Sequence, residues 1–194
     1  MKLSVVLPVF NGAATLRDAI ESVCLQNFDG YELIIIDDCS SDESPQILQE
    51  FEHNEFITFH RNKTNLGLFA SLNHGISLAS GSFIKLWAQD DIMMPNCLEQ
   101  FSRAAKSNPK ASFIWCWPEH ITEKGKLSTL AQPEEKSRRN GEVKSIKQCL
   151  KVFFFCGSLH GNISLLGFSK DTFTTVGPFQ NFIYSGDIDF TERA

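Results

Sequence analysis

The sequence of 194 residues predicts an α/β fold with a mostly parallel central sheet and helices on both faces. Strand-like and helix-like segments alternate from the first residues onward. The strand-like segments are continuous apolar runs, as expected for strands that are covered on both faces. Two of them lead into a pair of aspartates, Asp37-Asp38 and Asp90-Asp91. Because ligands of open α/β sheets bind beyond the carboxyl ends of the strands, these acidic pairs predict where a site lies.

Five strand-like segments lie in the first 117 residues, and a sixth follows much later in the chain. Each is rich in Val, Ile, Leu or Phe and is bounded by Gly, Pro, Asn, Asp or Ser. The predicted strands are Leu3–Phe10, Tyr31–Ile36, Phe56–His60, Ser82–Ala88, Ala111–Trp117 and Ile163–Ser169.

Apolar residues recur at helical spacing between these strands. Ser44-Pro45 supplies an N-cap and a first-turn proline for the second helix. The third helix, which begins at Leu68, stops at Ser80-Gly81, and the fourth is opened by Pro95. The first begins near Leu16, after the turn residues Asn11-Gly12.

The chain is long enough for one well-buried domain and short for two, so we expect a single domain over residues 1–194. Residues 1–117 form its regular α/β half. Residues 118–151 are polar and lack clear periodicity, and they predict a variable region. Residues 152–194 form a last segment, and a helix-like stretch at Ser145–Phe155 spans its start.

Composition excludes several classes of protein. A net charge of −5 gives no bulk attraction to nucleic acid, and no apolar run approaches the ~20 residues that a membrane span needs. The six cysteines are scattered without a C-x-x-C pair, which favours reduced thiols in a cytoplasmic protein over a zinc site or a disulfide framework. The segment Lys136–Lys151 has six basic residues against one acid, so it can face anionic lipid, although a solvated surface is the simpler interpretation.

Two adjacent carboxylates at a strand end suit a hard divalent cation such as Mg²⁺ or Mn²⁺, which prefers oxygen ligands and often completes its shell with phosphate oxygens and water. An isolated acidic pair would more often cap a helix and face solvent. The second pair, and a third acidic cluster near Asp187, favour the metal–diphosphate interpretation.

Four segments together resemble the family-two glycosyltransferases. They are "SVVLPVFNG", "ELIIIDDCSSD", "NLGLFASLNHGISLASGSFIKLWAQDD" and "GPFQNFIYSGDIDFTER", in the order and spacing of that family. The resemblance implies a glycosyltransferase A-type, Rossmann-like fold that binds a nucleotide-sugar through residues 1–117 and an acceptor through residues 152–194. The implied activity is metal-assisted, inverting transfer of a sugar from a UDP-sugar to an acceptor hydroxyl, on a saccharide or a lipid-linked molecule, in surface polysaccharide or glycolipid assembly. The implied location is the cytoplasm, with peripheral contact at the inner face of the membrane as a second expectation.

The resemblance also assigns roles to individual residues. The segment that matches Pro8, Val9 and Phe10 lies against the nucleotide base, and Asp38 hydrogen-bonds the uracil ring. Asn65 and Gly67 belong to the same donor-binding set. Asp90 lies near the ribose or sugar hydroxyls, Asp91 ligates the metal, and Asp187 is the base that takes the proton of the acceptor hydroxyl.

The sequence departs from the common family pattern in two places. Many members have a D-x-D-D motif, and here Ala88 stands where the first aspartate would be, with Gln89 at the variable position. The family pattern also continues beyond the segment that matches Asp187, whereas this chain ends at Ala194. A truncated, non-catalytic nucleotide-sugar-binding protein, or a subunit that needs a partner, is therefore the alternative expectation.

Two other functions fit less well. A signalling receiver domain places an acidic pair after its first strand and a phosphoacceptor after its third, whereas the predicted third strand here ends in His60-Arg61. A dinucleotide-binding enzyme needs a G-x-G-x-x-G after the first strand, and none is present.

Overall fold

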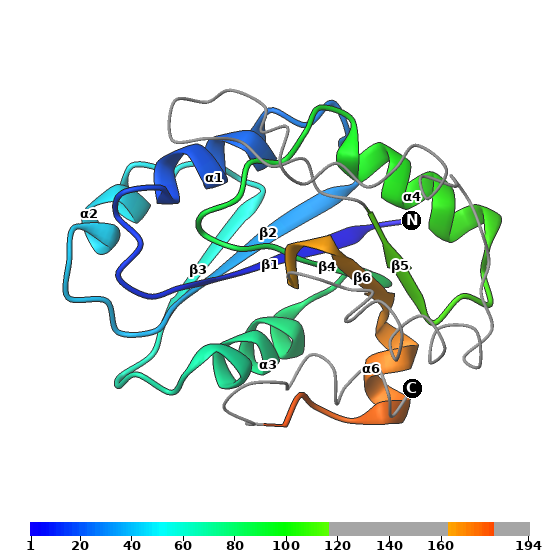
Figure 1. Ribbon diagram of the computed structural model, residues 1–194. Coiled ribbons are helices and arrows are strands. Elements are labelled where there is room, and N and C mark those ends of the chain that lie inside the picture. The colour runs from blue at the N-terminus through cyan, green and yellow to red at the C-terminus, as the bar shows by residue number, and fades with distance from the viewer. Residues whose placement is uncertain (117–162, 181–194) are drawn as a thin grey trace, which may run out of the picture.

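The computed structural model describes residues 1–116 and 163–180, and within them six strands form one sheet in the order β3-β2-β1-β4-β6-β5 (Figure 1). The strands are β1 (Leu3–Val9), β2 (Tyr31–Asp37), β3 (Ile57–Arg61), β4 (Phe83–Leu86), β5 (Phe113–Trp115) and β6 (Leu166–Ser169). The region 118–151, the predicted helix at Ser145–Phe155 and the segment around Asp187 lie outside the described residues.

The sheet is mostly parallel, as predicted. β1 pairs in parallel with β2 and with β4, and β2 pairs in parallel with β3. β6 runs antiparallel to both β4 and β5, and β5 is the edge strand on that side of the sheet. The predicted strand at Ile163–Ser169 starts as one 3₁₀ turn, Ile163–Leu165, before β6 begins.

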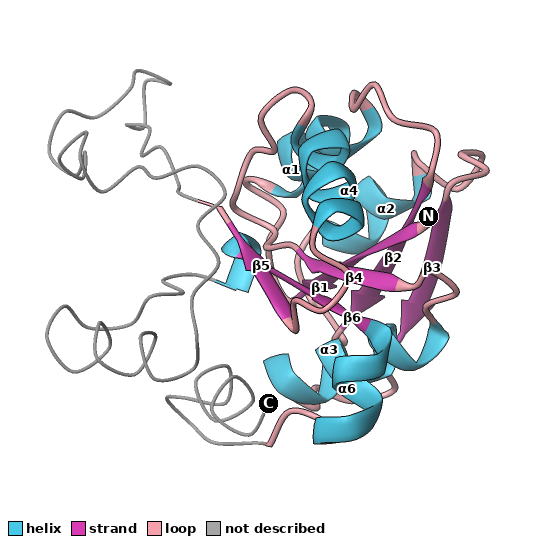
Figure 2. Cartoon of the chain, turned by 90° about the vertical axis from the view of Figure 1, so that its right-hand side faces the viewer, coloured by secondary structure: helices cyan, strands magenta, loops and turns pink. Residues whose placement is uncertain are grey.

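Helices cover both faces of the sheet, which confirms the predicted layering (Figures 1 and 2). One face carries α1 (Leu16–Cys24), α2 (Ser44–Gln49) and α4 (Cys97–Ser107), and the other carries α3 (Leu68–Leu78) and α6 (Lys170–Val176). No helix in the described part of the chain is long and apolar enough to cross a lipid bilayer.

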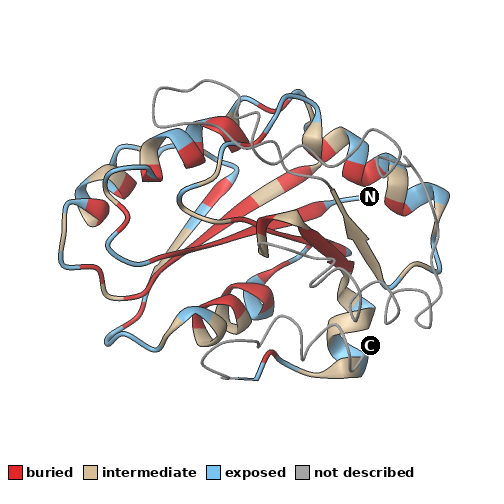
Figure 3. Cartoon of the chain, in the orientation of Figure 1, coloured by how far each residue is buried: buried red, intermediate tan, exposed pale blue. Residues whose placement is uncertain are grey.

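Alternation along the strands divides the core into two layers. Leu7 and Val9 of β1 pack toward α1 and α4, whereas Val6 packs toward α3. Figure 3 shows the central strands β1, β2, β4 and β6 as mostly buried, the edge strands β3 and β5 as partly exposed, and the outer helix surfaces as exposed. Close approach of α3 depends on Gly75, because a Cβ there would lie 2.5 Å from Val6 Cγ1 and 3.2 Å from Ile36 Cγ1.

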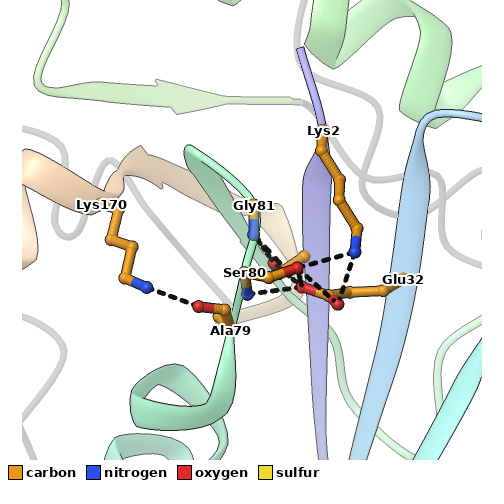
Figure 4. A network of polar contacts seen from close by, with 7 residues as sticks. Lys2, Glu32, Ala79, Ser80, Gly81 and Lys170 are labelled. Carbon is orange, nitrogen blue, oxygen red and sulfur yellow. Dashed lines mark hydrogen bonds and ion pairs between the residues drawn. The ribbon is translucent and has the colours of Figure 1, made fainter.

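A carboxylate in β2 joins the amino ends of three neighbouring strands (Figure 4). Glu32 accepts hydrogen bonds from the side chains of Lys2 and Ser4 and from the backbone N–H groups of Ser80 and Gly81. These donors come from the start of β1 and from the turn that enters β4. Burial by itself would raise the pKa of Glu32, but the hydrogen bonds lower it to about 2.

The start of α2 differs from the prediction by one residue. Ser44 is the first helical residue, and Glu43 occupies the N-cap without a side-chain cap bond. The N–H of Ser44 instead donates to Asp42 Oδ1 at 2.9 Å, so a nearby carboxylate satisfies the helix terminus. The hydroxyl of Ser44 is thereby available to accept from the N–H of Gly12 at 3.0 Å.

Candidate functional site

The carboxyl ends of β2, β1 and β4 lie next to one another and bring the predicted site residues to one edge of the sheet. Val9 is in register with Asp37, and the N–H of Asp38 donates to the carbonyl of Val9 at 2.7 Å. On the other side of β1, the N–H of Trp87 donates to the carbonyl of Val6 at 2.9 Å. Both acidic pairs therefore follow strands that flank β1.

The end of β1 presents an aromatic ring to solvent. Pro8 and Val9 are buried, and the side chain of Phe10 is 44% exposed. Pro8 has no N–H to donate and lies past the last β1–β4 pair, Val6 with Leu86, where the neighbouring strand has already ended. A proline is therefore tolerated in this central strand, because the missing N–H does not remove a hydrogen bond to a neighbouring strand.

Asp38 is buried and organises the loop that leads into α3. Its Oδ1 accepts from the side-chain amide of Asn62 and from the N–H of Leu66, and its Oδ2 accepts from the N–H of Gly67, each at 2.8 Å. A carboxylate has about four acceptor positions, so these three bonds leave about one. Asn65 Oδ1 accepts from the same Gly67 N–H at 3.0 Å.

Gly67 is the N-cap residue of α3 and has φ 88° and ψ 165°. This combination is essentially restricted to glycine. The predicted pair Asn65 and Gly67 therefore builds the loop directly against Asp38, and the structure brings all three together.

Asn62 extends this contact into a buried polar chain. Its Nδ2 also donates to Ser71 Oγ at 3.0 Å, and its Oδ1 lies 3.2 Å from His74 Nδ1. The ring of His60 packs edge-on against that of His74, with centroids 5.6 Å apart. This hydrogen-bonded network could not be predicted from the sequence, because a lone His or Asn carries no pattern.

Asp37 has a structural partner. Its Oδ2 lies 3.1 Å from Arg61 Nη1, and its Oδ1 accepts from the N–H of Ser40 at 2.9 Å. Arg61 also donates to the carbonyl of Ser40 at 2.8 Å. Arg61 thus supplies the positive charge that compensates the first acidic pair, and it holds the turn in which Cys39 adopts a φ of 65°.

The second acidic pair lies in the loop between β4 and α4. Asp90 is exposed and Asp91 is half-buried. Beneath them Lys85 is fully buried and donates to the backbone carbonyls of Leu86 and Ser164. Burial lowers the pKa of Lys85, and the nearby Cys116, Cys97 and Asp91 partly oppose that shift.

The described residues hold no group of three or more His, Cys, Asp or Glu side chains that could bind a metal by themselves. Asp90 and Asp91 offer hard oxygen donors at the surface, and Mg²⁺ commonly binds through one or two carboxylates together with substrate phosphates and water. The pair therefore fits a cation that is shared with a diphosphate, not a site made of protein ligands alone.

Gln89 connects this loop to the end of β1. Its Oε1 accepts from the N–H of Phe10 at 2.9 Å, and its Nε2 donates to the carbonyl of Phe10 at 3.2 Å. The sequence identified Gln89 only as the residue at the variable position of the motif. The predicted base Asp187 lies outside the described residues.

The known proteins that the sequence resembles are glycosyltransferases. A family model described as "Glycosyl transferase family 2" matches residues 4–164. The chain is 38% identical over 101 residues to the "Putative glycosyltransferase EpsE" of Bacillus subtilis (strain 168), covering 51% of this chain and 36% of that protein. It is 29% identical over 136 residues to the "Uncharacterized glycosyltransferase MJ1057" of Methanocaldococcus jannaschii, covering 69% and 47%. The chain thus spans less than half the length of these relatives.

Solved structures share the fold. Residues 1–349 of TarS from S. aureus, in complex with UDP, match with a TM-score of 0.77 at 18% identity over 98% of this chain and 54% of that one. The mannosyltransferase PcManGT from Pyrobaculum calidifontis, in complex with GDP-Man and Mn²⁺, matches with a TM-score of 0.62 at 16% identity over 92% and 47%.

Proposed function

The chain belongs to glycosyl transferase family 2 and has the glycosyltransferase A-type fold, and from this we propose that it transfers a sugar, with inversion, from a UDP-sugar to an acceptor hydroxyl on a saccharide or a lipid-linked molecule. One observation carries the proposal. The ends of three adjacent strands place an exposed aromatic ring, a buried carboxylate with acceptor capacity, and an acidic pair with one exposed and one half-buried member along one edge of the sheet.

In this proposal the nucleoside lies across the ends of β1 and β2. The Phe10 ring contacts the base, with Pro8 and Val9 forming the support behind it. Asp38 accepts from the imide N–H of uracil through its remaining acceptor position, a directional contact that favours uracil over a base without that donor. Asn65 and Gly67 hold the loop in contact with the Asp38 carboxylate.

The diphosphate lies toward the loop after β4. Asp90 contacts the ribose or sugar hydroxyls, and Asp91 holds the divalent cation. A bound Mg²⁺ or Mn²⁺ would neutralise the negative charge that builds on the departing nucleoside diphosphate. Ala88, at the place of the first motif acid, leaves Asp91 as the metal-ligating side chain of this motif.

The transfer itself needs a base. The acceptor oxygen bonds to the anomeric carbon on the face opposite the diphosphate, the bond from that carbon to the diphosphate oxygen breaks, and the hydroxyl proton passes to a carboxylate. The family resemblance gives that role to Asp187.

Calorimetric titration of UDP in the presence of Mn²⁺ or Mg²⁺ tests donor binding. We expect metal-dependent binding in the wild type, loss of the metal dependence in Asp91→Asn, and no change in Asp18→Asn, an exposed acid in the first turn of α1. No binding of UDP with either metal would overturn the proposal.

A screen of nucleotide-sugars, measured by release of nucleoside diphosphate, tests turnover. Release by the wild type that is lost in Asp187→Asn supports the assigned reaction and its base. UDP binding without release from any donor, in the presence of acceptor extracts, would instead support the non-catalytic alternative.

A further inference from the structure

The side-chain amide of Gln89 makes the two hydrogen bonds to the Phe10 backbone that the backbone of a neighbouring strand would otherwise make. Along β1, Val9 bonds toward β2 and Val6 bonds toward β4, so the polar groups of Phe10 face the side of β4. The backbone of β4 has already turned away after Trp87, whose N–H makes the last bond to Val6. The amide of Gln89 supplies both the acceptor and the donor that Phe10 needs there.

Gly12 makes room for this amide. A Cβ on Gly12 would lie 2.4 Å from both Cδ and Oε1 of Gln89. Gly12 has no positive φ, so an alanine would meet no backbone strain and the amide is the obstacle. The loop after β1 and the loop after β4 therefore pack closely where Gly12 meets the Gln89 side chain.

The two loops carry different parts of the proposed donor site. Phe10 presents the ring on the base side, and Gln89 directly precedes the acidic pair that begins at Asp90. Both hydrogen bonds lie at an exposed position, where water can replace them. Their main effect is thus on the relative placement of the loops, with a smaller effect on folding.

Resting on the proposed function, we propose that Gln89 is a positioning residue that couples recognition of the nucleoside to binding of the diphosphate and its cation. The amide fixes the Phe10 backbone, and with it the ring, against the loop that carries Asp90 and Asp91. Removal of the amide lets Phe10 sample other orientations. The apparent affinity for a nucleoside is then the intrinsic affinity multiplied by the fraction of molecules in which Phe10 keeps the binding-competent orientation.

Uridine is the probe that separates this role from a contact with phosphate or metal, because it carries neither. We expect Gln89→Met, which keeps the length of the side chain but not its amide, to weaken uridine binding about 5–10-fold in an NMR titration without divalent cation. Gln100→Met, on an exposed glutamine of α4, is the matched control and leaves the affinity unchanged.

A double-mutant cycle with Gly12 tests the coupling directly. Gly12→Ala displaces the Gln89 amide, so it should weaken uridine binding as much as Gln89→Ala does. The double variant Gly12→Ala with Gln89→Ala should bind like either single variant, because the side chain that the alanine meets is gone. Circular dichroism and thermal unfolding confirm that each variant is folded at the temperature of the titration.

The outcomes separate the two proposals. Uridine affinity of Gln89→Met within about twofold of the wild type, or additive effects in the cycle, overturns the positioning role and leaves the proposed function intact. A wild type that binds neither uridine nor UDP with Mn²⁺ overturns the proposed function, and the role of Gln89 falls with it.

Discussion

Asn62 donates from its side-chain amide to the carboxylate of Asp38 at 2.8 Å, and it thereby connects the residue after β3 with the residue after β2. Both side chains are buried, so the bond lies out of reach of bulk water. A hydrogen bond to a charged acceptor is stronger than a neutral one, and its loss leaves the carboxylate short of a donor. Asn62 thus determines how Asp38 holds the loop through Gly67.

The orientation of the Asn62 amide predicts the tautomer of His74. Because Asp38 can only accept, Nδ2 of Asn62 must face it, and Oδ1 must face His74. Neutral His74 should therefore carry its proton on Nδ1. Nitrogen-15 NMR of the imidazole ring distinguishes the two tautomers, and a ring protonated on Nε2 alone would contradict the prediction.

Removing the Asn62 amide should reduce both stability and donor binding. We expect Asn62→Ala to lower the free energy of unfolding by about 1–3 kcal/mol, because Asp38 and Ser71 each lose a buried partner. Urea denaturation measures the first effect and UDP titration the second. Asn54→Ala, at the opposite end of β3, is the control for UDP binding, because it removes a side chain that accepts from the N–H of Phe56 and lies away from the site. An unchanged midpoint for Asn62→Ala would show that the bond carries little energy.

The strands and helices followed from the sequence because the signals that define them are local. The continuous apolar run from Leu33 to Ile36 needs no distant partner to be identified as a buried strand. The contacts that shape the site were not predictable in that way. Asn62 lies 24 residues from Asp38, and Gln89 lies 79 residues from Phe10.

These contacts depend on the order of strands in the sheet. That order places β1 between β2 and β4, so the residues after each strand meet although they are distant in the chain. Gly67 and Gly12 show the same difference between a local sequence signal and a contact that depends on the fold. Gly67 belongs to a local motif that the sequence singled out, whereas the close approach of the Gln89 side chain to Gly12 follows from the fold and not from the local sequence.

Glu32 predicts a loss of stability in acid. Its pKa is about 2 in the folded protein, below the ~4.3 of an unfolded chain, so the folded state binds fewer protons between these values. The stabilisation is present above about pH 4.5 and is lost as the pH falls toward 2, and it amounts to about 1–2 kcal/mol after solvent screening.

Denaturation of the wild type and of Glu32→Gln at a series of pH values measures this contribution. The difference in unfolding free energy between the two proteins should shrink as the pH falls from about 5 to about 3. Glu55→Gln, an exposed glutamate outside this network, serves as the matched control. A difference that stays constant over this range would contradict the pKa of Glu32.

Gly67 should not tolerate a side chain. With φ 88° and ψ 165°, an alanine at this N-cap costs about 1–3 kcal/mol in unfolding free energy, and relaxation of that strain moves the N–H away from Asp38 Oδ2. Gly67→Ala is measured by urea denaturation beside Ala70→Gly. The second variant changes the first turn of α3 at a residue with ordinary helical backbone angles. Equal midpoints for Gly67→Ala and the wild type would show that the loop adapts at no cost.

Lys85 predicts a pH dependence of the same sign as that of Glu32, but in the alkaline range. Burial lowers its pKa in the folded protein below the ~10.4 of an unfolded chain, so between the two values the unfolded chain binds the additional proton. The free energy of unfolding therefore gains a term that rises with pH, by at most about 1.4 kcal/mol per pH unit.

The raised pKa of the Cys97 thiol, about 11, acts in the other direction, because that thiol loses its proton first in the unfolded chain. Lys85→Met removes the lysine: the wild type should gain stability relative to the variant as the pH rises from neutral toward ~10.4. A wild type that instead loses stability relative to Lys85→Met as the pH rises would mean that the ammonium form is favoured in the folded core.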